Sequence, residues 1–129
     1  MNNYFGMVSI VVEDYDDALN FYVNVLGFDC VEDKIMSPEK RWVVVKPKSK
    51  DGGSLLLAKA KNEREHAYIG NQTGGRVFLF LYTDDFDQFY QNLIDNDVYI
   101  AREVSIEPFG KVAVFSDLYG NLWDLIGSS

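Results

Sequence analysis

Apolar residues in the first half of the chain change their spacing once, and this predicts one helix among four strands. Residues 7–12 (MVSIVV) are β-branched and apolar, as in a buried strand. The next stretch has helical spacing, with Asp14 as its N-cap and Gly27 at its end. The helix face consists of Ala18, Leu19, Tyr22, Val25 and Leu26. Three strand-like runs follow, at residues 28–33, 41–47 and 54–60, so the predicted order is β-α-β-β-β.

The second half repeats this order. A strand is predicted at 76–83, then a helix capped by Asp84 or Asp85, and then strands at 97–103, 111–117 and 121–126. The two helix starts, Asp14 and Asp85, align at an offset of 71 residues (85 − 14), which indicates an internal duplication. We therefore expect a single domain, residues 1–129, with module 1 at about 4–60, a connector at 61–75 and module 2 at about 76–127.

Two motifs connect these modules to a known family. One reads A-x-x-F-Y-x-x-x-L-G-F from Ala18 to Phe28, and the other reads D-x-x-G-N-x-W-x-L from Asp117 to Leu125. With the repeated element order, they resemble the vicinal oxygen chelate superfamily, which includes glyoxalase I, extradiol dioxygenases, and fosfomycin- and bleomycin-resistance proteins. The resemblance implies an α+β fold in which two tandem β-α-β-β-β modules form a half-open curled mixed sheet around a central cavity. It also implies a homodimer.

The residues at the family's metal-ligand positions are mostly apolar. In metal-dependent members, ligands come from the first and last strands of each module and are usually His, Glu or Gln. The corresponding positions here are Met7, Leu56, Phe78 and Asp124. A catalytic zinc needs about three protein ligands, so one carboxylate is too few, and a register shift of one residue supplies no others. The sequence therefore predicts no metal and no cofactor at these positions.

The only histidine, His66, lies in the polar connector. It could join Glu63, Glu65 and Asp124 at a different metal site, but its charged neighbours favour a solvated side chain. The next segment, 70–75 (GNQTGG), could cover the cavity as a lid or could be an ordinary loop.

Strand alternation places Asp124 on the cavity side, with Trp123 and Leu125 beneath a helix. Poor solvation there raises the pKa of a carboxyl group unless a cation compensates. The candidate cations are Arg76, Arg41 and Lys111. Asp124 could be a polar anchor for a ligand's amine or hydroxyl, a general base, or half of a structural ion pair.

Composition and charge argue against several classes of protein. The net charge of −8 and the pI of about 4.5 disfavour binding to nucleic acid or to anionic membranes. No apolar run approaches the roughly 18 residues of a membrane span. Cys30 is the only cysteine, and the N-terminus has no signal-peptide pattern, so we expect a cytoplasmic protein.

An aromatic cavity wall is expected from Trp42, Phe78, Phe80 and Tyr82, although a place in the core is the more usual one for any single aromatic residue. The candidate ligand-binding residues are Met7, Trp42, Leu56, Arg76, Phe78, Phe80 and Asp124. With the resemblance, they suggest a protein of the bleomycin-resistance type that sequesters an aromatic or cationic organic molecule without metal chemistry. The alternatives are a metal-dependent glyoxalase-like lyase or dioxygenase, and a protein without a ligand whose modules serve assembly.

Overall fold

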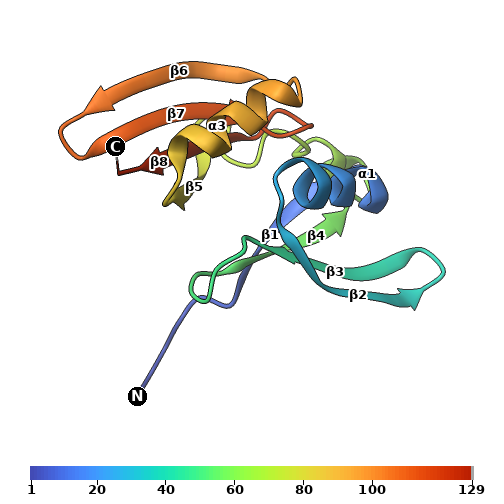
Figure 1. Ribbon diagram of the computed structural model, residues 1–129. Coiled ribbons are helices and arrows are strands. Elements are labelled where there is room, and N and C mark those ends of the chain that lie inside the picture. The colour runs from blue at the N-terminus through green and yellow to red at the C-terminus, as the bar shows by residue number, and fades with distance from the viewer. Residues whose placement is uncertain (129) are drawn as a thin grey trace. The chain divides into compact units, whose positions relative to one another are not determined.

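The computed structural model describes residues 1–128 and contains two four-stranded mixed sheets, one in each half of the chain (Figure 1). The chain divides into two compact units, one spanning Met1–Ile69 and a second that begins at Gly70. The predicted α+β class and tandem β-α-β-β-β order are confirmed. Within the described residues, no helix combines the length and apolar character that a membrane span requires.

The first unit has its strands in the order β1-β4-β3-β2, with β1 parallel to β4 and the other pairs antiparallel. Its elements are β1 (Met7–Val12), α1 (Tyr15–Leu19), the π-helical segment η1 (Asn20–Val25), β2 (Asp29–Ser37), β3 (Lys40–Lys46), β4 (Ser54–Lys59) and α2 (Glu63–His66). The helix begins where predicted, because an Asp14 carboxylate oxygen accepts a hydrogen bond from the Asp17 backbone N–H at 2.8 Å.

The predicted first helix widens halfway along its length. In η1 the Leu26 N–H donates to the Phe21 carbonyl at 2.9 Å, a five-residue spacing that defines a π-helical turn. Phe21, Tyr22 and Leu26 are all buried, so the wider turn directs two consecutive aromatic rings into the core. Gly27 then ends the helix with a φ of +80°.

The second unit repeats this arrangement with the strand order β5-β8-β7-β6. Its elements are β5 (Val77–Thr83), α3 (Phe86–Asp95), β6 (Ile100–Glu107), β7 (Gly110–Ser116) and β8 (Leu122–Gly127). Of the two predicted caps, Asp85 accepts a hydrogen bond from the Gln88 N–H at 3.3 Å. Helix α3 packs on β8, as Figure 1 shows, and buries Leu93 in a core with Phe115 and Leu125.

Two strands differ in extent from the prediction. β2 continues to Ser37 rather than ending at residue 33, and β6 begins at Ile100 rather than at residue 97. Both strands lie at a sheet edge, and most of their side chains are exposed. Because no buried face imposes an alternating apolar pattern on them, their ends leave little signal in the sequence.

The motif at residues 117–121 is a turn whose first and last residues, Asp117 and Asn121, are buried, and it leads into β8. The Asp117 carboxylate accepts hydrogen bonds from the N–H groups of Tyr119 and Asn121 and from the Asn121 side-chain amide, each at 2.9 Å. Gly120 has a φ of +104°, which favours glycine. The Asp, Gly and Asn of this motif thus have a structural role. They fix the point at which β8 begins, and thereby the place of Asp124 along that strand.

Candidate functional site

The main candidate site is a hollow of about 700 Å³ on one face of the second sheet. Four cross-strand neighbours form a row on this face. Phe80 on β5 pairs with Asp124 on β8, Asp124 pairs with Val114 on β7, and Val114 pairs with Arg102 on β6. Side chains of directly paired residues project from the same face of a sheet. Arg76, Val77 and Leu122 complete most of the lining.

Asp124 reaches this hollow because of the alternation along β8. Trp123 and Leu125, its neighbours in sequence, are 3% and 0% exposed and face the core on the opposite side. The Trp123 ring stacks on Phe115 at a centroid distance of 5.9 Å. This contact fixes which residues of β8 face the core and which face the hollow. Asp124 itself is half-buried and lines the hollow, on the face that alternation predicts.

The electrostatic environment of Asp124 has two opposing contributions. Removal of water raises the pKa of the carboxyl group above its ordinary value, and the positive charge of Arg102 offsets part of this rise. Within residues 1–128 the Asp124 carboxylate makes no hydrogen bond and no ion pair within 4 Å. It is therefore a polar group on a largely apolar sheet face whose bonding capacity is available to a ligand.

The charged neighbours of Asp124 differ from the sequence-based candidates. Arg76 does line the same hollow. However, the Lys111 ammonium group donates to Asp87 at 2.8 Å, and Arg41 is engaged within the first unit. Arg102 was missed, because two register shifts in the β6–β7 pairing obscure which side chains of β6 share a face with Asp124.

A register shift also changes the role of Phe78. Val77 pairs with Leu122, and Leu79 pairs with Trp123, so Phe78 lies at an irregularity between them. The shift places Leu79 on the core-facing side with Trp123 and places Phe80 beside Asp124. Phe80 lines the hollow and is 58% exposed, whereas Phe78 is half-buried and is not among the lining residues. The aromatic group at this site is therefore Phe80.

The first unit has a hollow of its own, of about 730 Å³. Trp42 and Leu56 line it, together with Tyr15, Lys40 and Lys59. The third residue expected here, Met7, lies on the edge strand β1 opposite Ser54 and is not among the lining residues. The cross-strand neighbour of Leu56 is instead Ser9.

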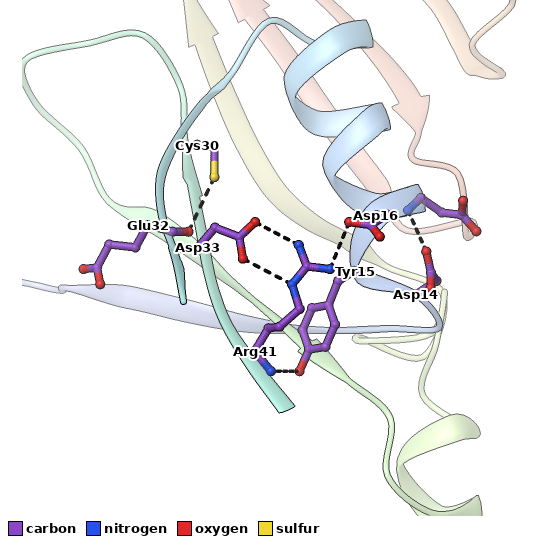
Figure 2. A network of polar contacts seen from close by, with 8 residues as sticks. Asp14, Tyr15, Asp16, Cys30, Glu32, Asp33 and Arg41 are labelled. Carbon is purple, nitrogen blue, oxygen red and sulfur yellow. Dashed lines mark hydrogen bonds and ion pairs between the residues drawn. The ribbon is translucent and has the colours of Figure 1, made fainter. Parts of the chain in front are cut away.

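Arg41 acts as a brace in the first unit (Figure 2). Its Nε and Nη2 atoms donate to the two Asp33 carboxylate oxygens at 3.2 and 2.8 Å, and its Nη1 donates to Asp16 at 2.9 Å. The guanidinium also lies over the Tyr15 ring, 5.2 Å from its centroid, and the Tyr15 hydroxyl accepts from the Arg41 backbone N–H at 3.2 Å. The hydrogen bonds to Asp33 and Asp16 raise the pKa of Arg41. These contacts join α1 to the β2–β3 hairpin.

The described residues do not fit a metal centre of the usual kind. Within residues 1–128 no three His, Cys, Asp or Glu side chains converge closely enough to hold an ion. His66 lies on α2 with its Nε2 atom 3.9 Å from a Glu13 carboxylate oxygen, and both side chains are exposed. A metal-dependent reaction therefore lacks an identifiable set of protein ligands in this part of the chain.

Comparison with known proteins gives a consistent assignment. The family model of the Glyoxalase/Bleomycin resistance protein/Dioxygenase superfamily matches residues 4–125. An uncharacterized protein of Shewanella frigidimarina is 52% identical over 120 residues, covering 92% of this chain and 89% of its own. YurT of Bacillus subtilis is 31% identical over 122 residues, covering 93% and 95% of the two chains.

Solved structures of similar length share the fold. UcmS2 is 29% identical with a TM-score of 0.82, and the match covers 97% of this chain and 98% of the other. TnmS3, an antibiotic binding protein from Streptomyces sp. CB03234, is 29% identical with a TM-score of 0.77 and coverage of 99% and 98%. The family match over nearly the whole length shows that this chain belongs to the glyoxalase/bleomycin resistance protein/dioxygenase superfamily.

Proposed function

We propose that this protein binds and sequesters a small organic molecule, with an aromatic ring system, and does so without metal chemistry. The hollow at Asp124 is the observation that carries the proposal. It combines an exposed ring, Phe80, with a half-buried carboxyl group that lacks a hydrogen-bond partner in the described residues. Concave surfaces with apolar walls and a few polar groups are typical of small-molecule sites.

The similarity to TnmS3 supports the same class of function. That protein is described as antibiotic binding, and its match covers 99% of this chain. One superfamily can host both binding proteins and enzymes, so the residues of the site must decide between them. The resemblance assigns Met7, Leu56, Phe78 and Asp124 to the family's metal positions, and Asp124 is the one among these four that can bind a hard cation.

Asp124 is the polar anchor in this proposal. Its carboxylate accepts a hydrogen bond from a ligand hydroxyl or amine while the ring packs on Phe80. An edge or face contact between aromatic rings contributes about 0.5–1.5 kcal/mol beyond area burial. A buried polar anchor adds orientation, because a ligand that lacks the matching group leaves the carboxylate unsatisfied.

Calorimetric titration with a panel of aromatic compounds tests the binding function. We expect saturable binding that weakens about tenfold in Phe80→Ala, which corresponds to the loss of one ring contact. Phe109→Ala is the matched control, because Phe109 is 64% exposed in the same unit and does not line the hollow. Failure of every compound to saturate, or equal weakening in both variants, would contradict the proposal.

Metal content tests the second half of the proposal. Purified protein is exposed to Zn, Ni, Mn or Fe(II), desalted and analysed, with Asp124→Ala as the comparison. We expect well under about a tenth of an equivalent, with no difference between the two proteins, because one carboxylate falls short of the usual three ligands. Near-stoichiometric metal that is lost in Asp124→Ala would instead support a glyoxalase-like lyase or dioxygenase.

A further inference from the structure

Two arginines beside the second-sheet hollow are uncommitted. Within residues 1–128, neither the Arg76 nor the Arg102 guanidinium makes a hydrogen bond or an ion pair within 4 Å. By contrast, Arg41 is saturated by Asp33 and Asp16. The chain has 20 Asp and Glu residues against 12 Lys and Arg residues, so internal acidic partners are plentiful. Both guanidiniums are exposed at the border of one hollow, so both are available to an anionic partner from outside.

The strand pairing shows how these groups are arranged. Phe80, Asp124, Val114 and Arg102 are successive cross-strand neighbours, so Arg102 lies two strands away from Asp124 and three from Phe80. Adjacent strands lie about 4.8 Å apart, so the backbone positions of Asp124 and Arg102 are separated by roughly 10 Å. Arg76 lies immediately before β5 and borders the same hollow. Adjacent hydroxyl and carboxylate groups on an aromatic ring lie closer together than this, so the long, exposed Arg102 side chain has to extend toward Asp124 to meet them.

We propose that this hollow selects an aromatic carboxylate whose ring lies on Phe80, whose carboxylate pairs with Arg102 and Arg76, and whose adjacent hydroxyl bonds to Asp124. The inference rests on the proposed function and names the chemical class of its ligand. Guanidinium is the side-chain group best matched to a carboxylate, because its planar N–H groups donate two parallel hydrogen bonds. The Asp124 carboxylate in turn accepts a hydrogen bond from the ligand hydroxyl.

The net charge of the chain would by itself favour a cationic ligand. That long-range attraction is screened over about 8 Å at physiological ionic strength. Contacts within the hollow act at much shorter range, and there the lining carries Arg76 and Arg102 against the single acid Asp124. The local balance is thus positive although the chain carries −8. The short-range interaction decides which ligand is retained, and it favours an anion.

Four naphthalene probes separate the contributions of the ring, the carboxylate, the hydroxyl and the sign of the ligand's charge in calorimetric titrations of the full-length protein. They are a hydroxynaphthoate with adjacent hydroxyl and carboxylate groups, the naphthoate without the hydroxyl, naphthol, and naphthylmethylammonium. We expect the hydroxynaphthoate to bind at least about tenfold more tightly than naphthol and to exceed the ammonium compound by more. Removal of the hydroxyl should weaken binding severalfold in the native protein and have no effect in Asp124→Ala.

Matched variants test the arginines. Arg102→Gln and Arg76→Gln should each weaken hydroxynaphthoate binding about tenfold and leave naphthol binding unchanged. Arg64→Gln makes the same change in net charge on α2, outside the hollow, and should have no effect on either. Circular dichroism of each variant verifies that it is folded, and Arg102→Lys should recover part of the affinity because it restores the charge without the planar pair of donors.

Each outcome bears on one proposal. If naphthol binds as tightly as hydroxynaphthoate, or the ammonium compound binds more tightly, the aromatic-acid inference is overturned and the proposed function stands. An equal loss of hydroxynaphthoate affinity in Arg64→Gln and Arg102→Gln would also overturn the inference, because the loss would then come from the net charge of the protein and not from a contact in the hollow. If none of the probes saturates and the wider aromatic panel also fails, the proposed function itself is overturned.

Discussion

Phe80 on β5 and Asp124 on β8 are direct cross-strand neighbours, with both side chains on the face that carries the hollow. An apolar ring and a carboxyl group that loses part of its hydration thus border the same hollow. The only charge that offsets the loss of hydration within the described residues is that of Arg102. This relationship makes the stability of the second unit depend on pH in a defined direction.

Asp124→Asn is expected to gain stability relative to the native protein as the pH rises. The pKa of Asp124 is raised in the folded state, whereas an unfolded aspartate titrates at about 3.9. Between the unfolded and the folded pKa values, the Asp124 carboxyl group therefore keeps its proton in the folded protein but has lost it in the unfolded chain. The free energy of unfolding that this carboxyl group contributes is fully present below about pH 4, and it is lost as the pH rises through the pKa of the folded state.

Urea unfolding of the two proteins between about pH 4 and pH 7 measures this difference. Arg102→Gln should enlarge the pH effect in a protein that retains Asp124, because the compensating charge is gone. Asp84→Asn, at an exposed position of the same unit, provides the control for the loss of one negative charge. A native protein that gains stability over Asp124→Asn on going from acid to neutral pH would contradict the assigned environment.

Arg41→Lys is expected to destabilise the first unit by about 1 kcal/mol. Lysine keeps the positive charge but cannot donate to both Asp33 oxygens and to Asp16 at the same time. Lys34→Gln, which removes the exposed pair with Glu32, should change stability by less than about 0.5 kcal/mol. Urea unfolding of both variants checks the comparison, and equal effects would show that the Arg41 brace contributes no more than a surface ion pair.

Asp117→Ala is expected to cost about 2–4 kcal/mol of stability. The substitution leaves three donors without their acceptor, namely the N–H groups of Tyr119 and Asn121 and the Asn121 amide, in a turn where Asp117 and Asn121 are both buried. Thermal unfolding monitored by circular dichroism measures the loss. Asp84→Ala changes an exposed position in the same unit, and its stability should stay within about 0.5 kcal/mol of that of the native protein. A loss of stability in Asp84→Ala as large as that in Asp117→Ala would contradict the role assigned to the buried turn residues.

Gly110→Ala is expected to cost at least about 3 kcal/mol or to prevent folding of the second unit. Gly110 has a φ of +143°, and a Cβ atom there would lie 2.1 Å from the Gly127 carbonyl oxygen, which belongs to the neighbouring strand. Gly74→Ala separates backbone strain from this collision, because Gly74 has a φ of +70° and open space around a Cβ. It should cost only about 1 kcal/mol. Comparable losses in the two variants, measured by urea unfolding, would contradict the predicted collision.

Much of the fold follows from local signals in the sequence. Asp14 was predictable as an N-cap, and the second cap was narrowed to Asp84 or Asp85, because a short acceptor before an apolar helical run satisfies a free backbone N–H within three residues. The alternation of Trp123, Asp124 and Leu125 likewise predicted which of the three leaves the core. These features depend only on neighbours in sequence, so no knowledge of the partner strand was needed.

Other features depend on contacts between distant segments. Phe78 was expected on the ligand-facing side, but the irregular pairing between β5 and β8 gives that place to Phe80. Arg102 escaped notice because two register shifts separate it from simple alternation on β6. A register shift is selected by hydrogen bonding to the adjacent strand and leaves little local trace in either sequence.

The sequence by itself determined the order of the elements, its repetition in the two halves, and the face of the last strand on which Asp124 lies. It did so because helix caps and strand periodicity are set by residues a few positions apart. Only the tertiary structure decided which charges surround that carboxyl group. Arg41 is held by Asp33, Lys111 by Asp87, and Arg102 lies across the sheet from Asp124. A long charged side chain pairs with whichever opposite charge lies near it in the folded protein. Asp124 and Arg102 are 22 positions apart (124 − 102) and come close only because β8 and β6 both pair with β7.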